Sequence, residues 1–106
     1  MKDGIYYVTF RSNMQDFGNG TVVVRNHEVN GGDFVYSYKG RVLANDVILQ
    51  LEQHDKSVTS VFGDIGNFTL GLFTLTTPTG YILRGGVQGM PETMIEVEAK
   101  FIGDLY

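Results

Sequence analysis

The sequence predicts an all-β protein, a single small up-and-down β-barrel of about eight antiparallel strands. Short segments alternate between apolar and other residues with a period of two, as strands with one buried face do. Turn residues separate these segments, and glycine, at 14 of 106 residues, is about twice as frequent as usual. Eight consecutive strands can close on themselves, which removes the exposed edges of an open sheet.

The strands expected in the first half of the chain are residues 4–10, 21–25, 28–30, 34–43 and 47–52. Between them the pattern predicts a loop at residues 11–17 and turns at residues 18–20, 26–27, 30–33 and 45–46. In the fourth strand, Phe34, Tyr36 and Tyr38 share one face because alternate side chains of a strand point the same way. We expect that face to be buried.

The second half begins with the least regular region, residues 53–67, where residues 57–62 could form one short helical turn or a strand. Strands follow at residues 68–73, 81–87 and 95–102, separated by turn signals at residues 77–80 and 89–91. Three glycines inside strands, Gly40, Gly71 and Gly85, favour the bent strands of a closed barrel over a two-sheet sandwich, which is the alternative.

Composition limits the chain to one domain, residues 1–106. It contains no cysteine, which suits a reducing cytoplasm, and no apolar run near the roughly 20 residues of a membrane helix. The first residues show no hydrophobic segment, so we expect no secretory signal peptide. The net charge is −4 and the basic residues are scattered, which argues against a nucleic-acid partner. We expect a cytoplasmic protein that binds neither nucleic acid nor membrane.

The interior of an eight-stranded barrel is either filled by its own side chains or holds one small ligand. If it holds a ligand, the apolar faces predict a small apolar molecule, to which tyrosine hydroxyls could offer polar contacts. We expect Val22 and Val24 to point into the interior as well. The candidates to line a cavity are Tyr6, Val8, Phe10, Phe34, Tyr36, Tyr38, Leu49, Leu51, Phe68, Leu70, Tyr81, Leu83, Val97 and Phe101.

No cofactor, metal or catalytic site is expected. Glu52, His54 and Asp55 could bind a metal in principle, but no spacing presents two imidazoles on one face. The serines lack a G-x-S-x-G motif. We therefore interpret residues 52–55 as a polar strand end in water.

The last two predicted strands carry three charged residues of interest, Arg84, Glu96 and Glu98. Glu96 and Glu98 lie side by side on the face opposite Val97, which we expect to face solvent. An enzyme would be indicated if Arg84 were buried with these two carboxylates beside His54, in an open cleft.

We also expect a homodimer. The faces opposite the core carry apolar residues whose exposure in a monomer would create a large patch: Ile5, Tyr7, Val23, Phe73 and Ile102.

Considered as a whole, the chain resembles the GrlR family of small negative regulators of type III secretion. The resemblance is carried by residues 1–6, 10, 12–13, 31–33, 38–40, 47–51 and 99–102. It implies a lipocalin-like β-barrel with an apolar interior that forms dimers and acts by binding a partner transcriptional activator rather than by catalysis.

One turn departs from that family. The resemblance implies a dense acidic run at the turn after the long strand, where partner contact occurs. In this chain the turn spans residues 43–47 and keeps only Asp46. Asn45 and Asp46 are therefore the candidates for partner contact.

Overall fold

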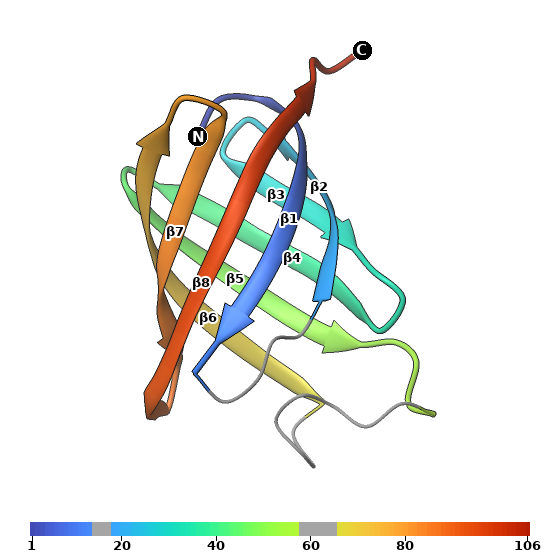
Figure 1. The fold of residues 1–106 in the computed structure, drawn as a ribbon. Helices are drawn as coiled ribbons and strands as arrows, with labels where there is room; N and C mark the ends of the chain where they lie inside the picture. Colours follow the sequence, from blue (N-terminus) through green and yellow to red (C-terminus); the bar gives the residue numbers. More distant parts are fainter. Residues whose placement is uncertain (14–17, 58–65) are drawn as a thin grey trace.

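In the computed structural model, which describes residues 1–13, 18–57 and 66–106, eight β-strands follow one another as an antiparallel meander (Figure 1). β8 returns to pair with β1, and this pairing closes the barrel. The predicted fold class is confirmed, and the described residues include no helix. The strands are β1 (Gly4–Ser12), β2 (Gly18–Arg25), β3 (Glu28–Gly32), β4 (Tyr36–Leu43), β5 (Asp46–Gln53), β6 (Asn67–Thr77), β7 (Gly80–Val87) and β8 (Met90–Gly103).

Several strands are longer than predicted. β1 continues to Ser12 because its polar end pairs with β8, as far as Ser12 opposite Ile95. β2 already begins at Gly18, opposite Phe10, where we expected a turn. The closing pair with β8 supplies the partners of the β1 end, and β1 supplies those of the β2 start; local alternation reveals neither. Of the helical turn predicted at residues 57–62, only Ser57 is described, in a turn, and the rest lies outside the described residues.

Two-residue turns connect the strands at the barrel end that carries both termini (Figure 1). Asn26 and His27 connect β2 to β3 with φ angles of 52° and 65°. Two positive φ values are typical of the turns whose twist matches a hairpin. The turn predicted at residues 45–46 is displaced by one position, since Ala44 takes a φ of 57° and Asp46 already belongs to β5.

The connection between β3 and β4 corrects the prediction for Phe34. We expected a strand from residue 34, but β3 continues to Gly32 and β4 begins only at Tyr36. The Asp33 side chain accepts hydrogen bonds from the backbone N–H of Val35 (2.7 Å) and of Tyr36 (2.8 Å). This aspartate-capped turn interrupts the alternation. Phe34 is therefore 94% exposed and not in the interior.

Glycines permit close strand contacts at two of the three predicted positions. A Cβ atom on Gly85 would lie 1.8 Å from the carbonyl oxygen of Gly71, and one on Gly40 would lie 2.3 Å from that of Ile48. A side chain at either position would clash with the neighbouring backbone. At Gly71 the nearest atom to such a Cβ is Nε2 of Gln88 at 3.9 Å, so close approach does not explain its identity.

Candidate functional site

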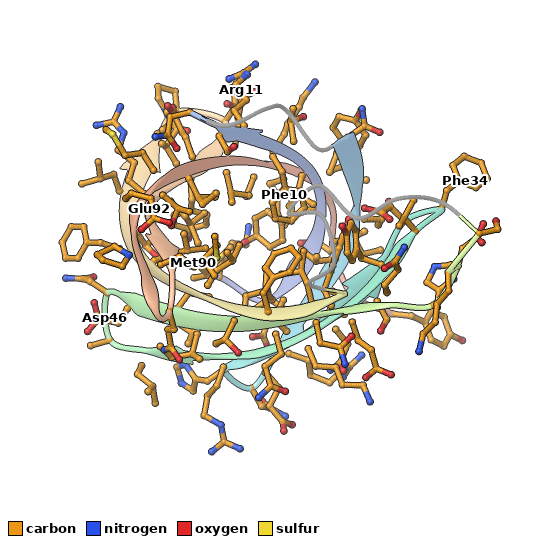
Figure 2. The ribbon with its side chains drawn as sticks, turned by 90° about the horizontal axis from the view of Figure 1, so that it is seen from below. Phe10, Arg11, Phe34, Asp46, Met90 and Glu92 are labelled. Carbon is orange, nitrogen blue, oxygen red and sulfur yellow. The ribbon has the colours of Figure 1, made fainter. Side chains whose placement is uncertain are left out.

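The interior contains most of the predicted cavity residues. Eleven are buried, namely Tyr6, Val8, Phe10, Tyr36, Tyr38, Leu49, Leu51, Phe68, Leu70, Leu83 and Val97. Tyr81 and Phe101 are partly buried and pack against this core at one end of the barrel. Figure 2 shows Phe10 inside the barrel, with Phe34 and Asp46 outside it on opposite sides. Phe34 is the one candidate that the structure removes from the interior.

The buried side chains leave little free space. The cavity among them has a volume of about 30 Å³ and an entirely apolar lining that includes Val8, Leu49 and Val97. Pockets for small molecules typically measure roughly 300–1,000 Å³. Of the two possibilities for a small barrel, this geometry favours the filled interior. A ligand would have to displace side chains.

The buried tyrosines also use their hydroxyls internally. Tyr38 donates a hydrogen bond to the carboxylate of Asp33, and Tyr6 donates one to the backbone carbonyl of Lys2. Burial, followed by the hydrogen bond to Asp33, raises the pKa of Tyr38 far above its ordinary value of about 10. The phenol is therefore neutral at physiological pH and holds the β3–β4 turn.

The residues considered for catalysis or metal binding do not converge. Arg84 and Glu96 are cross-strand neighbours whose side-chain atoms lie 4.0 Å apart on the outer surface, with 61% and 39% of the side chains exposed. His54 lies elsewhere, where its Nε2 atom is 2.8 Å from the carbonyl oxygen of Asp33. The described residues contain no cluster of three potential metal ligands.

The outer wall of the barrel carries an apolar patch over β4 to β7. On β6, Phe73 and Leu75 both point outward, 48% and 40% exposed. Leu75 pairs across the sheet with Ile82 of β7, and Phe73 pairs with Asp46 of β5. Asp46 in turn pairs with Leu43 of β4, which is 53% exposed. We call Leu43, Phe73, Leu75 and Ile82 the outer patch.

The two candidates for partner contact border this patch. Asn45 lies in the β4–β5 turn, and its carbonyl oxygen accepts a hydrogen bond from the backbone N–H of Thr74 at 2.7 Å. That bond fixes the turn against β6, between the two exposed residues Phe73 and Leu75. The structure thus brings Asn45 and Asp46 next to apolar residues that are far away in the sequence.

Opposite charges flank the centre of the outer patch. Phe73 has Arg84 of β7 as its cross-strand neighbour on one side and Asp46 of β5 on the other. Neighbouring strands are about 4.8 Å apart, so the two charged residues stand about 10 Å apart with the phenyl ring between them. In a two-fold symmetric contact over Phe73, these two charged residues would lie opposite charged residues of the second copy.

The remaining residues predicted for the homodimer gather on another part of the wall. Ile5 of β1 pairs with Val23 of β2, and Tyr7 follows on the same outward face of β1. Tyr7 and Ile102 are exposed, whereas Ile5 and Val23 are partly buried. These residues lie over β1, β2 and β8 and are not continuous with Phe73.

The fold defines the chain as a small closed antiparallel β-barrel with lipocalin-like architecture. Neither a comparison with protein-family models nor one with curated proteins finds a match for it. The resemblance to the GrlR family stays a prediction from the residues that carry it. In the described part of the chain there is no helix of the length and hydrophobicity needed to span a membrane.

Proposed function

We propose that this protein is a non-catalytic binding protein that acts through protein contacts on the outside of its barrel, in the first place with a second copy of itself. The observation that carries the proposal is the outer patch. Three large apolar side chains are 40–53% exposed on one part of the wall, Leu43 on β4 and Phe73 and Leu75 on β6, with Asp46 of β5 between them, while the cavity inside the barrel measures only about 30 Å³. Contiguous exposed apolar surface of this kind is typical of protein interaction sites.

The charges beside Phe73 favour a particular two-fold contact. An axis that runs along β6 through Phe73 would exchange the β5 and β7 sides of the patch between the two copies. Arg84 of each copy would then face Asp46 of the other. An axis across the strands would instead place Arg84 opposite Arg84, where like charges repel. A dimer in which the β6 strands of the two copies run in the same direction therefore fits the patch best.

The resemblance to the GrlR family adds a class of partner, a transcriptional activator of type III secretion. Its contact residues would include Asn45 and Asp46, because these border the outer patch. In such a complex the activator would compete with the second copy for Phe73.

The proposal is tested by the substitution Phe73→Ser. Light scattering of the wild-type protein over a range of concentrations should give about twice the monomer mass of 11.8 kDa. F73S should remain monomeric, because it removes the central apolar contact. The control is Phe34→Ser, which also removes an exposed phenyl group but lies outside the outer patch, and it should remain dimeric. A wild-type protein that is monomeric at high concentration would contradict the homodimer.

The alternative function, transport or sensing of a small apolar ligand, predicts a different result. A ligand that binds only the folded barrel raises its thermal stability with ligand concentration. We expect uncharged long-chain lipids to leave the melting temperature unchanged, because the interior is filled. Native mass spectrometry of the purified protein that showed a bound long-chain lipid would favour the carrier instead.

A further inference from the structure

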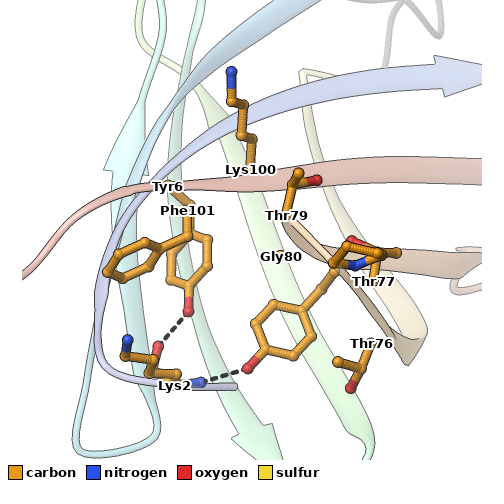
Figure 3. A pocket seen from close by; sticks show the side chains of 10 residues that line it. Lys2, Tyr6, Thr76, Thr77, Thr79, Gly80, Lys100 and Phe101 are labelled. Carbon is orange, nitrogen blue, oxygen red and sulfur yellow. Dashed lines mark hydrogen bonds between the residues drawn. The ribbon is translucent and has the colours of Figure 1, made fainter.

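The barrel end that carries both termini contains an open pocket of about 380 Å³ (Figure 3). Its apolar wall consists of three aromatic rings, contributed by Tyr6 of β1, Tyr81 of β7 and Phe101 of β8. The ring centroid of Tyr6 lies 5.9 Å from that of Tyr81 and 5.6 Å from that of Phe101. The rings support one another, so the wall exists before any ligand arrives.

Lys2 is held across this wall by its own backbone. Its carbonyl oxygen accepts a hydrogen bond from the hydroxyl of Tyr6, and its N–H donates one to the hydroxyl of Tyr81 at 3.0 Å (Figure 3). Its Nζ atom lies 4.4 Å from the centroid of the Phe101 ring, a cation–π contact. The ammonium group is therefore positioned at the rim of the pocket, with N–H groups left to donate to a ligand.

The electrostatics of the pocket are the opposite of those of the whole protein. The chain has a net charge of −4, yet the described residues that line the pocket include two lysines, Lys2 and Lys100, and no carboxylate. Asp3, the nearest acidic residue in sequence, accepts a hydrogen bond from the backbone N–H of Asn26 at 3.1 Å. That bond directs the Asp3 carboxylate toward the β2–β3 turn.

The remaining polar groups are neutral hydroxyls. Burial, together with the neighbouring Tyr81, raises the pKa of Tyr6, so its phenol does not become an anion near neutral pH. Thr77 and Thr79 add hydroxyls from the β6–β7 hairpin. Hydroxyls and ammonium groups beside apolar rings suit a molecule with an apolar body and a negative end.

We infer that this pocket binds a small organic carboxylate with a ring or short chain as its apolar body. The body would lie against the partly exposed rings of Tyr81 and Phe101, which the fully buried Tyr6 ring supports from behind, and the carboxylate would pair with the ammonium of Lys2. The volume is at the lower end of the range for small-molecule pockets, which limits the body to one or two rings. The site uses no residue of the outer patch and opens at the end of the barrel, where Tyr6, Tyr81 and Phe101 close the interior.

The test uses two probes of the same shape, 2-naphthoate and the uncharged 2-naphthalenemethanol. Each is titrated into the full-length protein and followed by amide NMR shifts. We expect shifts centred on Gly80, Tyr81 and Phe101, and a preference for naphthoate of about fivefold, the effect of one partly exposed ion pair. The substitution Lys2→Met should abolish that preference and leave binding of the alcohol unchanged.

The matched control is Lys39→Met, which removes an exposed lysine from the outer face of β4. It should keep the full preference for naphthoate. Equal affinity for the two probes, an equal loss of preference in K39M, or shifts centred away from the three named residues would each overturn the inference. Lys2 is exposed, so K2M should fold normally, and its unperturbed spectrum away from the pocket verifies this.

Discussion

Among single residues, Tyr38 connects the barrel interior with the turn between β3 and β4. Its ring packs 5.2 Å from that of Phe10, centroid to centroid, and its hydroxyl donates to the carboxylate of Asp33. The same carboxylate accepts the two backbone N–H groups of the turn. One buried phenol therefore stabilises the local conformation that directs Phe34 outward.

The substitution Tyr38→Phe tests this connection. It keeps the ring and removes the hydroxyl, so the Asp33 carboxylate loses one partner. We expect the free energy of unfolding to fall by about 1–3 kcal/mol, measured with a chemical denaturant. Tyr7→Phe on the outer face of β1 serves as the control and should change it by less than about 0.5 kcal/mol. A Y38F protein as stable as the wild type would show that the hydroxyl contributes nothing.

The raised pKa of Tyr38 also makes stability depend on alkaline pH. In the unfolded chain this phenol ionises near pH 10, whereas in the folded protein burial and Asp33 keep it protonated. The folded state therefore binds more protons above pH 10, and its stability falls as the pH rises. The contribution of Tyr38 to that slope is about 1.4 kcal/mol per pH unit. Unfolding measurements between pH 9 and 11 should show a shallower decline for Y38F.

At the level of strands, close backbone contacts decide which glycines are required. A methyl group at Gly85 would lie 1.8 Å from the Gly71 carbonyl oxygen, whereas one at Gly71 would have no atom closer than 3.9 Å. Gly85→Ala should therefore lower the free energy of unfolding by about 3 kcal/mol or more, since β7 must move away from β6. Gly71→Ala should be neutral or slightly stabilising. Equal effects of the two substitutions would contradict this reading of the contact.

Strand existence could be predicted from the sequence, but the strand ends could not. Alternation identified the buried faces of β5 and β6 because each has one side in the core. At Phe34 the same alternation was misleading. The apolar residues at positions 34, 36 and 38 continue the pattern, while the side chain of Asp33 imposes a turn. An aspartate after two glycines was the signal available there.

On the scale of the whole molecule, the outer patch shows what local patterns leave out. Phe73 was recognisable as an apolar residue on an outward face. Its neighbours Leu43 and Ile82 lie on other strands, β4 and β7. Leu75 lies on the same strand as Phe73 but beyond its predicted end at residue 73. Only the register of the closed barrel places them together, beside Asn45 and Asp46. The filled interior likewise depends on side-chain packing, which strand count alone leaves open.

The two-fold contact proposed for the outer patch makes a prediction about charge reversal. If Arg84 of each copy faces Asp46 of the other, then D46K and R84E each replace two attractions by two repulsions. Each single variant should weaken the dimer about tenfold or more in dissociation constant, measured by sedimentation equilibrium. The double variant restores opposite charges at both contacts and should regain most of the wild-type affinity.

This pattern distinguishes the two possible axes. With an axis across the strands, position 84 would meet itself, and no combination of the two reversals could restore attraction there. The control is R25E, which reverses one exposed charge on β2, two strands away from Leu43 of β4. It should leave the dissociation constant unchanged. If the D46K/R84E double variant forms a weaker dimer than either single variant, the axis along β6 is wrong, even if the wild-type protein is a dimer.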